Sequence, residues 1–139
     1  MRDDGVIDTL GSLALFADLS RPELESVAHT WEEEWHPEGQ RILRQGFTGN
    51  NFYVILEGEA AVRIDGQDRA TLGKGDFFGE VSVLLGEPPT ADVVATRPLH
   101  CLVLGGPDVE GFLIGLPKLM FRLLQAEARR LRNTIQWRA

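Results

Sequence analysis

The chain has 139 residues, a formal net charge of −7 and a single cysteine, Cys101. The acidic balance opposes binding to nucleic acid, because phosphate contacts need a basic face, and one thiol can form neither an internal disulfide nor an iron–sulfur cluster. No run approaches the roughly 18 apolar residues of a membrane span and no N-terminal signal pattern is present, so we expect one soluble, cytoplasmic domain over residues 1–139.

Residues 1–30 carry the pattern of two short helices. The first is indicated by apolar residues at helical spacing, interrupted by Gly11: Val6, Ile7, Leu10, Leu13 and Leu15. The second is announced by Ser20, which stands three residues before Glu23 as in a capping box, with Pro22 in the first turn. We therefore expect a helix from about residue 21 to residue 30.

Residues 31–104 change to short runs of β-branched and aromatic residues, separated by turn signals about every 8 to 12 residues. The step Asp65-Gly66 is a natural hairpin turn. Short, regularly spaced strands favour a sandwich, a jelly roll or a small barrel. The predicted fold class is mostly β with flanking helices: an antiparallel, jelly-roll-like β-roll, or double-stranded β-helix, between N-terminal helices and a long C-terminal helix.

Residues 106–139 return to the helical period, with Pro117 expected to start the long helix. One apolar stripe is formed by Leu116, Leu119, Met120, Leu123, Leu124, Ala128, Leu131 and Ile135. The other face carries Arg122, Arg129, Arg130, Arg132 and Arg138, which we interpret as a solvated face beside the basic C-terminus. A surface for a homodimer or a partner protein is the alternative.

Catalytic and metal-binding patterns are sparse. His29, His36 and His100 never occur as closely spaced pairs, and His100 and Cys101 point to opposite faces of a strand. No nucleophile with a base is visible. We therefore expect no enzyme activity, no metal and no cofactor.

The stretch "FFGEVSVLLGEPPTADVV", residues 77–94, carries a more specific pattern, which points to a binding site. If Gly79 begins a short helix near 79–85, the following amides lie beside the positive end of a helical turn, where an anion is stabilised. The carboxylate of Glu80 would repel a phosphate but accept hydrogen bonds from ribose hydroxyls. A nucleotide satisfies both demands; the alternative is an ordinary short core helix.

The chain resembles the cyclic-nucleotide-binding domain family, the β-roll module of bacterial catabolite activator proteins, cyclic-nucleotide-dependent kinases and gated channels. The resemblance extends from "LFADLSRPELESVA" through "LGKGDFFGEVSVLLGEPPTADVVA", which matches the phosphate-binding cassette, to "PLHCLVLGGPDVEGFLIGLPKLMFRLLQAEARRLR". It implies a sensor for cAMP, cGMP or a related small anion, in which Gly79 and the next amides face the cyclic phosphate and Glu80 takes the 2′-hydroxyl. The implied ligand-binding residues are Phe78, Gly79, Glu80, Val81, Ser82, Pro89, Thr90 and Ala91.

Pro89 departs from the family pattern, since it occupies the position of the cassette arginine that neutralises the phosphate. Proline supplies neither charge nor a backbone N–H, and loss of a buried charge partner costs about 2–5 kcal/mol. Thr90 resembles the residue of cGMP-preferring members, and Arg97 is a distant candidate to replace the lost charge. Two hypotheses stay open: a sensor that binds its ligand weakly, or a degenerate member that serves as an interaction or dimerisation domain.

The resemblance also concerns the end of the chain. In some members an aromatic residue near the end of the last helix covers the base, and Trp137 is placed to do so; anchoring the helix is the alternative. In the transcription factors of the family a helix-turn-helix domain follows this helix. The chain stops at Ala139, so we expect a stand-alone module that signals through its C-terminal helix.

Overall fold

The computed structural model of the chain describes residues 4–47 and 51–134. Its N-terminal part consists of helix α1 (Asp4–Gly11), the 3-10 turn η1 (Ala14–Phe16) and helix α2 (Arg21–Thr30). The expected capping box is confirmed, because Ser20 Oγ accepts a hydrogen bond from the Glu23 N–H at 3.3 Å and Glu23 Oε1 accepts one from the Ser20 N–H at 2.8 Å. This reciprocal pair fixes the start of α2.

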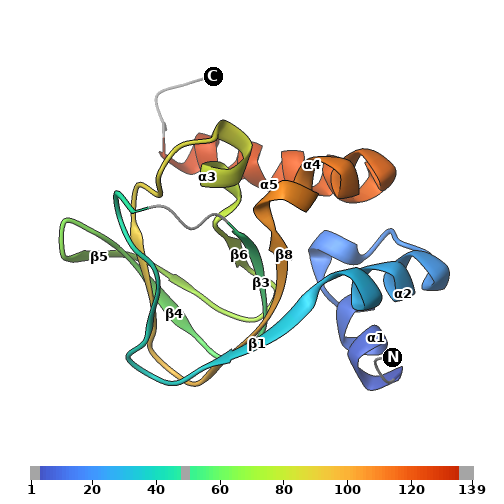
Figure 1. Cartoon of the computed structure of the whole chain (residues 1–139), viewed down its shortest axis with the longest axis horizontal. Helices are drawn as coiled ribbons and strands as arrows, with labels where there is room; N and C mark the ends of the chain where they lie inside the picture. Colours follow the sequence, from blue (N-terminus) through green and yellow to red (C-terminus); the bar gives the residue numbers. More distant parts are fainter. Residues whose placement is uncertain (1–3, 48–50, 135–139) are drawn as a thin grey trace.

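The described residues contain eight strands in two antiparallel sheets of four (Figure 1). The strands are β1 (Glu32–His36), β2 (Arg41–Leu43), β3 (Asn51–Glu57), β4 (Ala60–Ile64), β5 (Gln67–Leu72), β6 (Phe77–Phe78), β7 (Asp92–Ala95) and β8 (Leu99–Gly105). Their order is β1-β8-β3-β6 in one sheet and β2-β7-β4-β5 in the other. The predicted antiparallel β-roll with flanking helices is thereby confirmed.

Strand β3 is buried on both of its faces, which explains its uninterrupted apolar sequence. Phe52, Val54 and Leu56 point into a core shared with the helices. Tyr53 and Ile55 alternate with them and point into the core between the two sheets. The sheet that contains β3 is therefore the middle layer of the domain.

The hairpin between β4 and β5 forms where the sequence indicates it. Asp65 and Gly66 both have positive φ, 52° and 80°, and the flanking residues Ile64 and Gln67 pair across the turn. These angles match a type I′ turn, whose twist suits an antiparallel hairpin.

Helices α4 (Gly106–Gly115) and α5 (Pro117–Thr134) lie beside α3 (Glu80–Leu85) on one side of the β-roll (Figure 1). Pro117 starts α5 as expected. The predicted apolar stripe is buried only in the first half of α5, at Leu119 and Leu123, whereas Leu124 and Leu131 farther along are 63% and 54% exposed. A helix that rests on the body along a narrow strip leaves the neighbouring apolar positions in solvent. Ile135 and Arg138 lie outside the described residues.

Cys101 is fully buried between the sheets, and burial, together with the nearby Glu34, raises the pKa of its thiol to about 12. Cys101 therefore serves as a small residue of this core. A search of residues 4–47 and 51–134 finds no helix with the length and apolarity needed to cross a membrane.

A substitution at Gly58, between β3 and β4, tests the packing of this fold. Gly58 has φ +104°, and a Cβ at this position would lie 2.2 Å from the carbonyl oxygen of Pro98. We expect Gly58→Ala to lower the free energy of unfolding by about 2–4 kcal/mol, from backbone strain plus a main-chain clash. Urea unfolding measures this loss.

Gly39→Ala is the matched control. Gly39 has a similar φ, +89°, but an added Cβ meets nothing within 4 Å. This variant should show only the smaller strain of about 1–2 kcal/mol. Equal losses for the two variants would contradict the close contact at Gly58.

Candidate functional site: the pocket beside helix α3

Strand β6 and Gly79 set the position of the site. Phe78 stacks on Tyr53 of β3 with ring centroids 4.7 Å apart and planes 7° from parallel. Gly79 then takes φ +86°, and a Cβ here would lie 2.2 Å from the Asn51 carbonyl oxygen. Only glycine permits this close approach, so α3 begins directly against β3.

Helix α3 is short and ends in a tight turn. The Val83 N–H donates to the Gly79 carbonyl at 3.3 Å, and Gly86, with φ +66°, ends the helix. Ser82 Oγ donates to the Glu87 carbonyl, while the Glu87 N–H returns a hydrogen bond to the Ser82 carbonyl at 3.1 Å. These bonds turn the chain back toward the β-roll.

The segment after α3 is held by the loop that follows β2. Pro89 is buried, and its carbonyl accepts a hydrogen bond from the Gly46 N–H at 2.8 Å. Asp92 Oδ1 accepts one from the Gln45 N–H at 2.7 Å. Pro89 thus has a defined place in the wall of the site, although its side chain brings no charge.

A cavity of about 580 Å³ lies between α3, the β-roll and α5. Its size falls in the range of small-molecule sites. The eight residues that the family resemblance implies all line it: Phe78, Gly79, Glu80, Val81, Ser82, Pro89, Thr90 and Ala91. Apolar side chains of the β-roll, including Leu43, Val62, Leu72 and Val93, line it as well.

Arg130 of α5 reaches into this site, which corrects the interpretation of a solvated face for this arginine, while Arg129 and Arg132 are exposed. Its guanidinium donates to Glu80 Oε2 at 2.9 Å and to the Phe77 carbonyl at 2.8 Å, and lies 4.1 Å from the centroid of the Phe77 ring. Arg122 is also engaged, in a two-pronged ion pair with Asp18 at 2.6 and 2.9 Å. Sequence periodicity could not reveal these pairings, because each joins residues far apart in the chain.

The carboxyl group of Glu80 is almost completely removed from water, with 3% of the side chain exposed. Burial, followed by the adjacent Glu127 carboxyl, raises the pKa of Glu80 from its ordinary 4.5 to about 8, while Arg130 opposes this rise. A buried carboxyl that faces both a carboxyl and a guanidinium is poised between its protonated and charged forms.

Arg69 of β5 is a second cation that lines the cavity and that the sequence did not single out. Within the described part of the chain it has no ion-pair partner. Arg97, the candidate named from the sequence, does not line the cavity. The cations near the missing cassette arginine therefore come from β5 and α5 rather than from the chain after Pro89.

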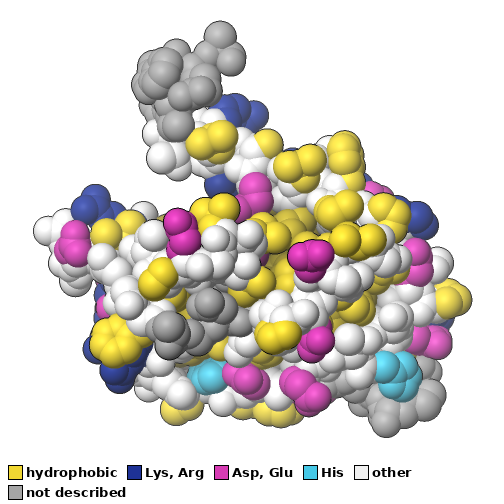
Figure 2. All heavy atoms as spheres, turned by 45° about the horizontal axis from the view of Figure 1, so that its top comes forward, with side chains coloured by type: hydrophobic (Ala, Val, Ile, Leu, Met, Phe, Trp, Pro, Cys, Tyr) yellow, Lys and Arg dark blue, Asp and Glu magenta, His cyan; other side chains and the backbone are white. Residues whose placement is uncertain are grey.

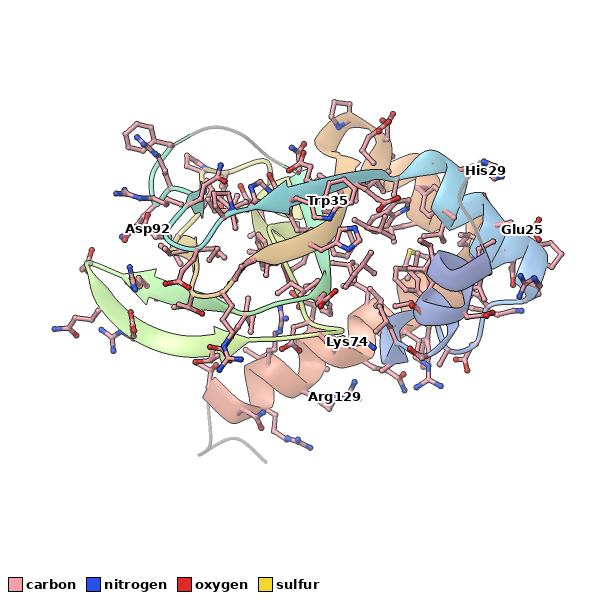
Figure 3. All side chains as sticks on the ribbon, turned by 90° about the horizontal axis from the view of Figure 1, so that it is seen from below. Glu25, His29, Trp35, Lys74, Asp92 and Arg129 are labelled. Atoms are coloured by element: carbon pink, nitrogen blue, oxygen red, sulfur yellow. The ribbon has the colours of Figure 1, made fainter. Side chains whose placement is uncertain are left out.

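Two further expectations concern the lid and the absence of a metal site. Trp137, the suggested lid, lies outside the described residues. Trp35, labelled on β1 in Figure 3, stacks on His100 with centroids 4.5 Å apart, and His100 Nε2 lies 2.8 Å from Glu33 Oε2. Over residues 4–47 and 51–134 no group of three or more His, Cys, Asp or Glu side chains could hold a metal ion.

Comparison with known proteins agrees with this geometry. The family described as "Cyclic nucleotide-binding domain" matches residues 33–114, which is more than half of the chain. The chain therefore belongs to the cyclic nucleotide-binding domain family, as the resemblance in its sequence indicated.

One curated relative is the cGMP-dependent protein kinase egl-4 of Caenorhabditis briggsae, 34% identical over 103 residues. The match covers 70% of this chain but only 14% of the kinase. Among solved structures, the catabolite activator protein of Thermus thermophilus has a TM-score of 0.80 at 30% identity, covering 88% of this chain and 60% of that chain.

A second similar solved structure is a triple mutant of the regulatory subunit of a cAMP-independent protein kinase A from Trypanosoma brucei, bound to cAMP in the A site. It has a TM-score of 0.75 at 27% identity and covers 88% of this chain and 46% of that chain. The chain described here thus corresponds to one part of longer relatives.

The raised pKa of Glu80 predicts a pH-dependent stability. The pKa of Glu80 in the folded protein, about 8, lies above its ordinary value of 4.5. The stability that protonated Glu80 contributes is therefore fully present below pH 4.5 and is lost as the pH rises through 8. Relative to Glu80→Gln, the parent should lose about 1 kcal/mol or more of unfolding free energy between about pH 5 and 8. Urea unfolding at a series of pH values measures this.

Glu87→Gln, an exposed carboxyl of the same segment, is the control. The plot of unfolding free energy against pH for this variant should run parallel to that of the parent. If the Glu80→Gln curve also runs parallel to the parent, Glu80 does not titrate in this window.

Proposed function

We propose that this regulatory domain binds a cyclic nucleotide, or a related anionic ligand, in the cavity beside α3. The observation that carries the proposal is that the complete set of cassette residues implied by the family lines one cavity of about 580 Å³, with Glu80 in its wall. Gly79 and the amides after it would face the phosphate and Glu80 the ribose. In this proposal residues 1–139 act as one cytoplasmic, non-catalytic domain.

We propose that binding is weak, because Pro89 replaces the arginine that would pair with the phosphate. Charge-assisted hydrogen bonds are roughly twice as strong as neutral ones, and Thr90 offers a single neutral hydroxyl. Arg69 and Arg130 line the cavity and supply the positive charge that favours an anion.

Restoring the cassette arginine should strengthen binding. We expect Pro89→Arg to bind cAMP or cGMP at least about tenfold more tightly than the parent, because a buried charge pair is regained. Isothermal titration calorimetry with each nucleotide, up to millimolar concentration, measures the change.

Pro88→Arg adds the same charge one residue earlier, at an exposed position, and is the matched control. If both variants gain equally, the effect is general attraction rather than a phosphate contact. Micromolar or tighter binding by the parent would contradict the proposed weakness. If no nucleotide binds to the parent or to Pro89→Arg, the pocket is not a cyclic-nucleotide site.

A second proposed function is self-association through α5, either together with ligand binding or in its place. Phe121, Leu124, Ala128 and Leu131 follow one another at spacings of three and four residues, and all four are exposed. This is the a/d pattern of a two-helix seam. Figure 2 shows hydrophobic side chains gathered on the face that α3, α4 and α5 form.

A charge in this seam should separate the copies. We expect Leu124→Glu to convert a dimer to a monomer in sedimentation equilibrium, because a carboxylate would be buried without a partner. Arg132→Glu, at an exposed position off the seam, should leave the dimer intact. A monomeric parent at about 100 μM would rule out this function, since stable dimers bind far more tightly.

A further inference from the structure

We propose that the outer edge of strand β1 (Glu32–His36) binds an extended, basic segment of a partner protein, which pairs with β1 as an additional strand of the sheet β1-β8-β3-β6. This edge is separate from the proposed ligand site, because no residue of β1 lines the cavity beside α3. Binding of the partner segment therefore does not require a nucleotide.

Strand β1 lies at the end of its sheet. β8 pairs with it on one side, from Glu32↔Val103 to His36↔Leu99, and among the described residues no second strand pairs with it. In Figure 3, β1 runs along one margin of the β-roll, with Trp35 labelled on it. The edge of a sheet presents backbone N–H and C=O groups, to which another extended chain can bind.

The direction of the backbone groups of β1 follows from the strands beside it. In β3, the Ile55 N–H donates to the Asp76 carbonyl and the Ile55 carbonyl accepts from the Gly75 N–H, each at 2.8 Å. The backbone groups of Ile55 therefore point toward β6. Because this direction alternates along a strand, the backbone groups of Val54 point toward its partner in β8, Leu102.

The same alternation places backbone groups of Trp35 at the outer edge. Cys101 follows Leu102 in the alternation, so its backbone groups point toward its partner in β1, Glu34. Trp35, the next residue of β1, consequently directs its N–H and C=O away from β8. No backbone hydrogen bond from elsewhere in the described chain reaches them. Trp35 thus offers one donor and one acceptor to an added strand.

The side chains of β1 favour a basic partner. Glu32, Glu33 and Glu34 are consecutive, so carboxylates stand on both faces of the strand, and β1 contains neither lysine nor arginine. Glu32 is exposed. An added strand with lysine or arginine on both of its faces would place opposite charges across the ladder, which stabilises the pairing.

A second copy of the chain fits this edge poorly. Two β1 strands paired antiparallel would bring glutamates of both copies opposite each other, and like charges across a ladder are destabilising. Each copy also carries a net charge of −7. The acidic edge therefore opposes self-pairing and favours a partner of opposite charge.

Trp35 supplies apolar contact area at the same edge. It is 66% exposed, although its ring stacks on His100 with the planes 8° from parallel. The stack covers one face of the indole, so the exposed area lies on the other face and on the ring edge. Large aromatic side chains are frequent anchors of protein interfaces. A side chain of the added strand would pack on this open face.

Fluorescence anisotropy with labelled peptides tests the binding. The probe is KTKVTKVK with blocked ends, whose lysines lie on both faces of an extended strand. We expect it to bind at least about fivefold more tightly than KTKPPKVK, which has the same charge, because two adjacent prolines remove an N–H from either edge of the peptide. The acidic peptide ETEVTEVE should bind more weakly than both. Equal binding of KTKVTKVK and KTKPPKVK would reduce the effect to general charge attraction and overturn the proposal.

Two charge-reversal variants locate the site. Glu32→Lys should weaken binding of KTKVTKVK at least about threefold, because the lysines of the peptide would meet a like charge. Glu110→Lys is the matched control, since Glu110 is an exposed residue of α4 and the change in net charge is the same. At about 0.15 M salt, which screens distant charges, this variant should bind the peptide nearly as the parent does. Equal weakening by both variants contradicts a site on β1, and thermal unfolding checks that both are folded.

Backbone-amide NMR identifies the strand that binds. Titration with KTKVTKVK should shift the amides of residues 32–36 most and slow the hydrogen exchange of the Trp35 N–H. The proposal is overturned if the largest shifts lie elsewhere, or if the peptide does not bind at about 1 mM. A dimer of the parent whose interface is formed by residues 32–36 would also overturn it, since a second copy would then occupy the edge.

Discussion

A carboxyl group that is removed from water needs a charged or hydrogen-bonding partner, and the partner of Glu80 comes from the far end of the chain. Arg130 supplies it, 50 residues away in sequence and 2.9 Å away in space. The contact requires α5 to lie across the cassette with its outer half near α3. The position of the last helix and the charge at the proposed ligand site consequently depend on the same contact, between Arg130 and Glu80.

The cassette itself is built by backbone geometry more than by charge. Gly79 allows α3 to start against the Asn51 carbonyl, and the Gly46 N–H holds the carbonyl of Pro89. Neither contact depends on the side chain at position 89. This explains how the cavity keeps its shape with proline at position 89.

The outer half of α5 combines two properties that usually conflict. It exposes Leu124 and Leu131, which favours association with another apolar surface, and its polar contacts with the cassette come from Arg130. This half is held by the contacts of Arg130 with Glu80, the Phe77 carbonyl and the Phe77 ring, and by the partly buried Ala126.

Much of this structure could be predicted from short stretches of the sequence. The capping box at Ser20, the Asp65-Gly66 hairpin, the start of α5 at Pro117 and the cassette from Phe78 to Ala91 all depend on residues close together in sequence, so each was predictable. The roles of Arg130 and Arg69, and the exposure of Leu124, were not. A helical period shows which residues share a face, but only tertiary packing decides which part of that face meets the body, and which distant carboxyl a guanidinium reaches.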